Sequence, residues 1–92
     1  MRQDQAETIA IQALGWIASE EGLIDVFLGA TGADLHNLKE SVKDPDFLIA
    51  VLDFLMGDDS HVIGFCDQAG LPYETPMQAR QALPGGAQVN WT

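Results

Sequence analysis

The chain has 92 residues, of which 14 are Asp or Glu and only 4 are Lys or Arg, so its formal net charge is −10. This length allows a single domain, because two hydrophobic cores would each be too small to offset the entropy of ordering the chain, and 47% hydrophobic residues suffice for one core. Direct binding to nucleic acid and docking on anionic lipid are disfavoured, since both rely on Lys and Arg side chains, which leaves basic proteins as the electrostatically natural partners.

A first helix is predicted from Asp4, which can cap it while Glu7 occupies the capping-box position. Apolar residues then recur three and four positions apart, as they do on the buried face of an amphipathic helix. Trp16 falls off this face, so we expect it to be exposed unless another helix covers it. The residues expected to face the core are Ala6, Ile9, Ala10, Ala13, Leu14 and Ile17.

A second helix is predicted from Ser19, with Glu20 and Glu21 in its first turn, where carboxylates favour the positive end of the helix dipole. Gly32 is expected to end it in the left-handed conformation. A third, short helix is predicted over residues 34–41. The residues expected to face the core are Leu23, Val26 and Phe27 in the second helix, and Leu35, Leu38 and Val42 in the third.

The central helix has the clearest local signal. Asp44 is a good N-cap, and Pro45 stands at the first helical position, where its missing N–H costs nothing. The apolar residues that follow are so dense that little polar surface remains, so this helix is expected to cross the core. Its inward stripe is Phe47, Leu48, Val51, Leu52 and Leu55.

Two further helices complete the predicted all-α array of about six short helices. One opens at Asp58 and ends at Gly70, and the last runs from Thr75, as part of a capping box, to Leu83. No segment alternates with the period of two that a strand requires. We therefore expect a single helical domain over residues 1–86 and a C-terminal tail over residues 87–92 that contains Trp91.

The array is open to two interpretations. It is either a duplicated three-helix unit or a set of unrelated helices, because the helical period alone aligns apolar positions at some register. The duplication rests on a shift of 38 residues that aligns the two halves of the chain. Matched pairs include Ile11 with Ile49, Leu14 with Leu52, Trp16 with Phe54, Phe27 with Phe65, Gly32 with Gly70, and Glu20-Glu21 with Asp58-Asp59.

Residues with catalytic chemistry are few. His61 follows Asp58 by three positions and can share a metal or a proton with it, but an Asp at that place is already explained as a helix cap. Cys66 is predicted to lie on a buried apolar face, where its thiol pKa would be raised. We therefore predict no catalytic residue, no metal site and no cofactor.

Apolar residues that fall off the buried faces are the first candidates for binding a partner. They are Trp16, Ile49 and Phe54, together with Trp91 in the tail. For Ile49 and Phe54 the alternative is a core wide enough to take both faces of their helix. Which of these side chains are exposed depends on how the helices pack.

Acidic pairs are the second candidate. Glu20 with Glu21, and Asp58 with Asp59, form a candidate acidic patch for a basic partner. Helix capping alone also places carboxylates at such positions. Part of the negative charge is thus already explained by local structure.

The cysteine content, the first residues and the apolar segments of the chain indicate its cellular compartment. Cys66 is its only cysteine, so no internal disulfide can form and a reducing compartment is the simplest setting. The first residues lack the basic and apolar regions of a signal peptide. The most apolar run, residues 47–56, is about half of the ~20 residues that a bilayer crossing needs. We expect a cytoplasmic protein without a membrane segment.

The order of these features resembles a family of small, functionally uncharacterised bacterial helical proteins, a domain of unknown function of about this length. The resemblance covers nearly the whole chain and is carried by residues 13–17, 27–32, 44–48 with 51–55, and 69–72. Most of these are core and capping positions. The resemblance implies a small helical protein and brings no catalytic residue, cofactor or partner with it.

Three functions follow as hypotheses. The leading one is a non-enzymatic protein–protein interaction or regulatory module that binds a basic or apolar-patch partner or forms a homodimer. The second is an acidic nucleic-acid mimic that inhibits a basic DNA-binding protein. The third is a small metal-dependent enzyme that uses His61 with Asp58.

Overall fold

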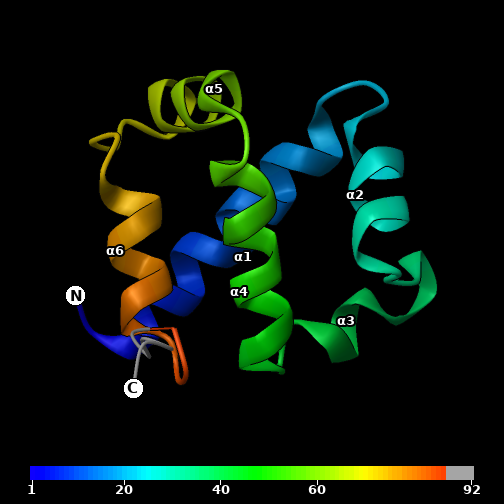
Figure 1. The fold of residues 1–92 in the computed structure, drawn as a ribbon, viewed down its shortest axis with the longest axis horizontal. Coiled ribbons are helices and arrows are strands. Elements are labelled where there is room, and N and C mark those ends of the chain that lie inside the picture. Colours follow the sequence, from blue (N-terminus) through cyan, green and yellow to red (C-terminus); the bar gives the residue numbers. More distant parts are fainter. Residues whose placement is uncertain (87–92) are drawn as a thin grey trace.

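Residues 1–86, the part of the chain that this computed structural model describes, fold into six α-helices and one short 3₁₀ helix (Figure 1). No residue in this range forms a β-strand, so the predicted all-α fold is confirmed. None of the helices between residues 1 and 86 has both the length and the hydrophobicity of a membrane-spanning segment. The elements are α1 (Gln3–Ser19), α2 (Leu23–Thr31), η1 (Leu35–Asn37), α3 (Leu38–Ser41), α4 (Pro45–Met56), α5 (Asp59–Ala69) and α6 (Thr75–Ala82).

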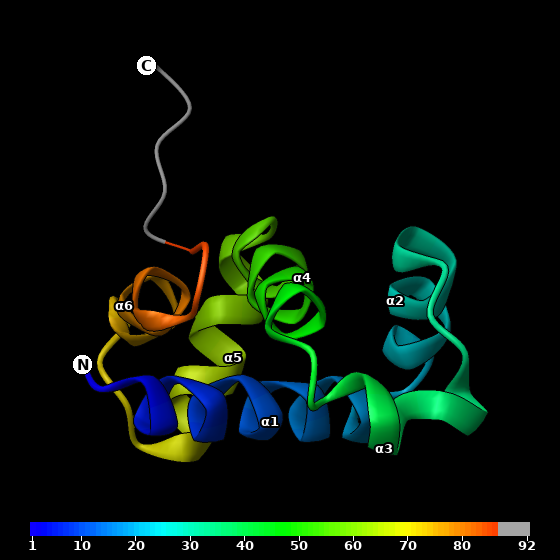
Figure 2. The ribbon, with the colours of Figure 1, turned by 90° about the horizontal axis from the view of Figure 1, so that it is seen from below.

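Helix α1 is the base on which the other long helices lie. It packs closely against α4 and α6, which also pack against each other. Figure 2 shows α1 beneath α6 and α4, with α2 standing at its C-terminal end. The packed face of α1 carries Ala6, Ala10 and Ala13, all fully buried. These small side chains allow the helix axes to approach closely.

Most residues predicted to face inward from α1 and α4 are part of the buried core. In α4 the inward residues Leu48, Val51, Leu52 and Leu55 are buried as expected. The cap of α4 is also as predicted, because the Asp44 carboxylate accepts the N–H of Asp46 at 3.0 Å. The other buried hydrophobic residues are Ala6, Ala10, Ala13, Leu14, Trp16, Ile17, Phe27, Phe65, Cys66, Ala79 and Leu83.

The start of the second helix was predicted wrongly. Glu20 is extended and ends α1, and the left-handed Gly22, with φ of +78°, precedes α2, which begins at Leu23 rather than at Ser19. Glu20 and Glu21 therefore lie in the turn between α1 and α2 and not in the first turn of a helix. Within α2, Phe27 is buried as expected, but Val26 is 57% exposed.

The third predicted helix is weaker than expected. The Asp34 carboxylate accepts the N–H of His36 at 2.9 Å and tightens the chain into the 3₁₀ turn η1, which one turn of α-helix, α3, follows. Neither element has a buried residue, and Leu35, predicted to face the core, is 58% exposed.

The N-caps of two helices precede the predicted ones, by two residues at α1 and by one residue at α6. Helix α1 begins at Gln3 with Arg2 as N-cap, and the Gln5 side chain accepts the Arg2 backbone N–H at 3.1 Å. Helix α6 begins at Thr75 with Glu74 as N-cap, and Thr75 is buried instead of capping. In both places the predicted cap lies inside the first turn.

Candidate functional site

Trp16 is the candidate residue whose position differs most from the prediction. Its side chain is only 8% exposed, so the expectation of an exposed tryptophan was wrong. The indole is covered by α5, where it meets Phe65 edge to face, with ring centroids 6.4 Å apart. Gly64 makes room for it, since a Cβ at Gly64 would lie 2.8 Å from Trp16 Cζ2. The periodicity of α1 alone cannot show that a second helix covers this side.

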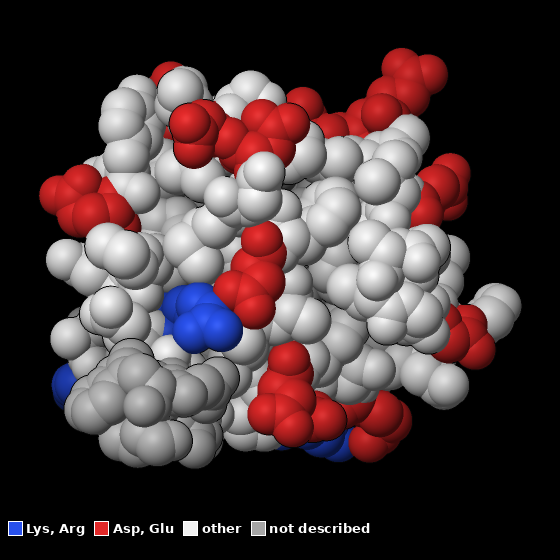
Figure 3. All heavy atoms as spheres, viewed as in Figure 1, with Lys and Arg blue, Asp and Glu red and all other residues white. Residues whose placement is uncertain are grey.

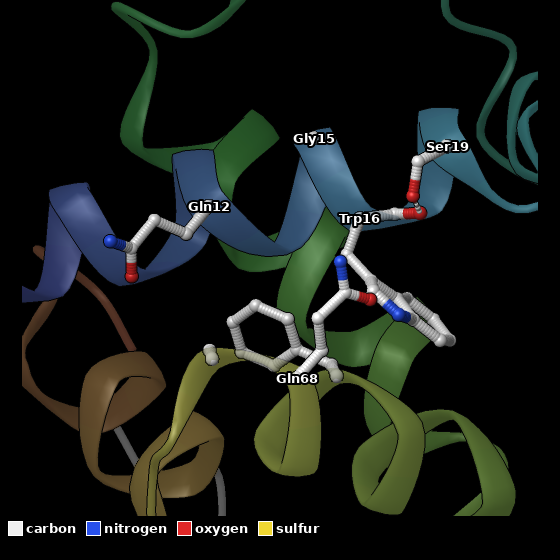
Figure 4. Close-up of a pocket in the computed structure, with 7 residues that line it drawn as sticks. Gln12, Gly15, Trp16, Ser19 and Gln68 are labelled. Carbon is white, nitrogen blue, oxygen red and sulfur yellow. Dashed lines mark hydrogen bonds between the residues drawn. The ribbon is translucent and has the colours of Figure 1, made fainter.

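A hollow of about 320 Å³ lies between α1 and α5 beside Trp16 (Figure 4). Helices α1 and α5 each pack closely against α4. The large Trp16 side chain spans the space between α1 and α5 and reaches Gly64. In Figure 4 the Gln68 side chain rises from α5 toward Trp16, and the Ser19 hydroxyl donates to the Trp16 carbonyl at 2.7 Å. The lining residues are Gln12, Gly15, Trp16 and Ser19 from α1, and Phe65, Gln68 and Ala69 from α5.

A second hollow, of about 600 Å³, continues along the N-terminal half of α1. Gln12 lines both hollows, so they adjoin at this residue. We call the two together the α1 groove. Its second part is lined by Met1, by Gln5, Thr8, Ile9 and Gln12 on α1, and by Leu71, Thr75 and Gln78 on the opposite side.

The α1 groove carries no ionised side chain on any of its lining residues. Its floor is apolar, with Trp16 and Phe65 buried beneath it, while glutamine amides, hydroxyls and glycine form its rim. By contrast, acidic side chains are spread over the face in Figure 3, which lies away from α1. A groove without ionised side chains, on a molecule with a net charge of −10, is a local exception to its surface chemistry.

The predicted acidic patch comes from two separate turns. Glu20 and Glu21 are exposed between α1 and α2, and Asp58 and Asp59 lie at the start of α5. Figure 1 shows both turns at the upper end of the molecule. Asp58 also has the predicted capping role, because Ser60 donates to its carboxylate from the hydroxyl at 2.7 Å and from the backbone N–H at 2.9 Å. These hydrogen bonds hold the pKa of Asp58 below its usual value.

The pair of His61 with Asp58 is loose, with 3.8 Å between Nε2 and Oδ2. The imidazole ring lies between aromatic neighbours, stacked on Phe54 at 5.7 Å and edge-on to Trp16 at 6.0 Å between centroids. Its Nδ1 is buried without a hydrogen-bond partner. Within residues 1–86 no third His, Cys, Asp or Glu stands near enough to complete a metal site.

Cys66 is buried on the inner face of α5, as predicted. Burial is the main cause that raises the pKa of its thiol, and the charge of Asp67 adds to the shift. A protonated, covered thiol is a poor nucleophile and a poor metal ligand. Cys66 therefore acts here as a small core residue.

Ile49 and Phe54 are half-buried, so the wide core takes up part of both. Phe54 meets Phe27 edge to face at 5.3 Å and lines a third hollow, of about 390 Å³, between α2 and α4. Trp16 and Phe54 thus border different hollows and do not form one patch. Trp91 lies outside the described residues.

Sequence reasoning missed the glutamines of the groove, such as Gln12 and Gln68. They belong to helices far apart in the chain, and neither carries a recognised motif. A signal was nevertheless present, because Gln5, Thr8 and Gln12 recur at helical spacing as uncharged polar residues in a strongly acidic chain.

The chain belongs to the family described as "Protein of unknown function (DUF3572)", whose model matches residues 3–86. The match includes every helix from α1 to α6. No curated protein and no solved structure matches the chain. The resemblance to a family of uncharacterised helical proteins is therefore confirmed, and any activity must be argued from the geometry of the chain itself.

Proposed function

We propose that this protein is a non-enzymatic interaction module that binds an apolar segment of a basic partner protein in the α1 groove. The observation that carries the proposal is the absence of charged side chains from the groove lining of an otherwise acidic protein. Desolvating a charged side chain under a partner is costly, so an uncharged lining favours binding. A reduced, buried Cys66 fits a cytoplasmic setting for this role.

The dimensions of the groove suit a short peptide segment. Gln5 and Ser19 both line it, and along a helix they are separated by about 21 Å at 1.5 Å per residue. This is the length of about four helical turns, or of about six residues of extended chain. A helix laid in a groove or an extended strand are both common ways to bind peptides.

The chemistry of the lining indicates how such a segment is held. Apolar side chains of the segment would cover the floor formed by Trp16, Phe65 and the half-buried Ile9 and Leu71. Rim amides such as Gln68 carry both donors and acceptors, so they can pair with a peptide backbone or with polar side chains. The apolar contacts supply affinity and the amides fix the register.

The partner is proposed to be basic because of the charges that surround the groove. Glu20 and Glu21 follow Ser19 at one end of it, and Asp67 precedes Gln68 on α5. The negative field of these carboxylates attracts Lys and Arg at long range and raises the association rate. The carboxylates themselves stay outside the groove and need not contact the bound segment. We expect bound segments to have apolar centres and basic flanks.

A displayed peptide library tests the proposal directly. Gly15→Glu places a charge in the groove, and Gly29→Glu on α2 is its matched control, because both glycines are exposed, helical and free of atoms within 4 Å of an added Cβ. The wild type and Gly29→Glu are expected to enrich the same basic-flanked apolar peptides, and Gly15→Glu is expected to lose them. Equal enrichment by all three proteins would contradict the proposal.

Salt distinguishes groove binding from nucleic-acid mimicry. Binding through an apolar floor should persist at ~0.5 M salt, where the Debye length is only a few ångström, whereas mimicry should be lost there. The measurement is titration calorimetry of an enriched peptide at low and high salt. Loss of all binding at high salt would favour the mimic.

A second copy of the chain is the alternative occupant of the groove. In that case the wild type would show a concentration-dependent dimer in sedimentation, and Gly15→Glu would be monomeric at the same concentrations. The Gly29→Glu control would still dimerise. If all three proteins are monomeric, a second copy does not occupy the groove, and a partner protein stays the proposed occupant.

A further inference from the structure

The hollow between α2 and α4 lies apart from the α1 groove and has an apolar lining. Ala30 and Thr31 line it from α2, and Ala50, Asp53 and Phe54 line it from α4. Its only charged lining residue, Asp53, is paired with the Arg80 guanidinium of α6. We call it the α2/α4 hollow.

The described chain ends close to Asp53, one of the residues that line this hollow. Arg80 Nη1 donates to the Gly86 carbonyl at 2.8 Å, while Nε and Nη2 of the same guanidinium donate to the Asp53 carboxylate. One side chain thus joins Gly86 to the wall of the hollow. Only glycine fits at position 86 in this conformation, because a Cβ there would overlap the Arg80 carbonyl oxygen.

The sequence after Gly86 is Ala-Gln-Val-Asn-Trp-Thr, which has no charged side chain and contains one large aromatic residue, Trp91. Trp91 follows Gly86 by five positions, and at 3.3–3.6 Å per residue an extended chain would span about 17 Å over that distance. The α2/α4 hollow is therefore within reach of the Trp91 side chain.

We propose that the chain's own C-terminal segment, residues 87–92, docks on the α2/α4 hollow with the Trp91 indole against Phe54. The hollow has a volume of about 390 Å³, and small side chains at Ala30 and Ala50 leave room for a large ring. The Phe54 ring already makes edge and stacked contacts with Phe27 and His61, so an indole would extend this aromatic cluster.

The hydrogen-bonding groups of the hollow and the charge of the molecule also favour residues 87–92 as the occupant. A buried indole N–H needs an acceptor, and Asp53 Oδ2 has capacity for one because a carboxylate oxygen has two lone pairs and Arg80 Nη2, at 3.4 Å, engages one of them. The side chains of the segment carry no charge, so they are not repelled by the acidic body of the molecule. A short tether also gives the segment an effective concentration that a free partner rarely reaches.

Tryptophan fluorescence tests the proposal, because the chain has two tryptophans and Trp16→Phe leaves Trp91 alone. In this variant Trp91 should emit at a shorter wavelength, and be quenched several-fold less by acrylamide, than the same residue in a synthetic peptide of residues 84–92. Adding Ala30→Glu should give Trp91 the emission and quenching of the peptide. Adding Ala18→Glu should change neither, since Ala18, like Ala30, is an exposed alanine one residue before the end of its helix.

Three results would overturn the proposal. The first is peptide-like emission from Trp91 in the folded Trp16→Phe protein, with folding checked by circular dichroism. The second is a protected Trp91 that Ala30→Glu does not release. The third is protection that disappears on dilution, which would assign the hollow to a second copy. If Trp16→Phe fails to fold, the difference spectrum between the wild type and Trp91→Phe measures the same emission.

Discussion

Helix α6 and the η1–α3 segment are the third elements of the two proposed halves, yet only α6 packs into the core. Helix α6 lies against both α1 and α4 and buries Ala79, while η1 and α3 have no buried residue. At the end of the molecule that contains α2, Phe27 is the one fully buried side chain of that helix, and partly buried residues such as Leu23 and Leu28 pack around it against the core. The duplication stays a prediction, and the third helices of the two proposed halves differ in how they pack.

The largest expected effect tests how far the α2 end depends on Phe27. Phe27→Ala should lower the free energy of unfolding by about 3–5 kcal/mol, because it leaves a cavity and removes aromatic contacts with Phe47 and Phe54. Val26→Ala, one residue earlier and exposed, should change it by less than about 0.5 kcal/mol. Urea denaturation of both variants checks this. Similar losses would mean that α2 packs in a way the structure does not describe.

The next effect compares a glycine-to-alanine substitution in α5, beside Trp16, with the same substitution in α2. Gly64→Ala should destabilise by about 1–3 kcal/mol, because the new methyl group overlaps the Trp16 ring. Gly29→Ala in α2 meets no atom and should stabilise by about 0.5–1 kcal/mol through helix propensity. Thermal melts of the two variants should therefore shift in opposite directions. Shifts of the same sign would contradict the contact of Gly64 with Trp16.

A smaller effect concerns the pH dependence of the aspartate cap of α5. The folded state lowers the pKa of Asp58, so the ionised carboxylate adds stability that is present above the unfolded pKa of about 3.9 and is lost as the pH falls through the folded value. Asp58→Asn should remove this part of the acid sensitivity. Urea midpoints between neutral and acidic pH measure the difference. Identical pH profiles for the wild type and Asp58→Asn would refute it.

The smallest effect is local to the loop between α5 and α6. The Tyr73 hydroxyl donates to the Asp67 carboxylate at 2.7 Å, and this hydrogen bond raises the pKa of the phenol. Tyr73 is the only tyrosine, so its ultraviolet absorbance titration needs no assignment. Asp67→Asn should return the titration to the ordinary range. An unchanged midpoint in that variant would show that the hydrogen bond is not formed in solution.

The parts of the fold with local signals could be predicted from the sequence. Asp44 with Pro45 located the start of α4, Asp58 located that of α5, and the apolar spacing located most of the core. The prediction failed where tertiary contacts decide, because α1 presents Trp16 to a helix that begins some forty residues later. It also failed at Gly22, which was not recognised as a turn residue. The α1 groove was missed for the same reason, since Gln12 and Gln68 line one hollow only in the folded chain.

The position of Gly86 has a practical consequence for immobilising the protein. Its carbonyl is held by Arg80, and Figure 2 shows that this end of the described chain lies on the side away from α1. A tag appended after residue 92 would therefore anchor the molecule to a surface with the α1 groove facing the solution. Met1 lines the groove, so a tag at the N-terminus would stand at its edge and obstruct it.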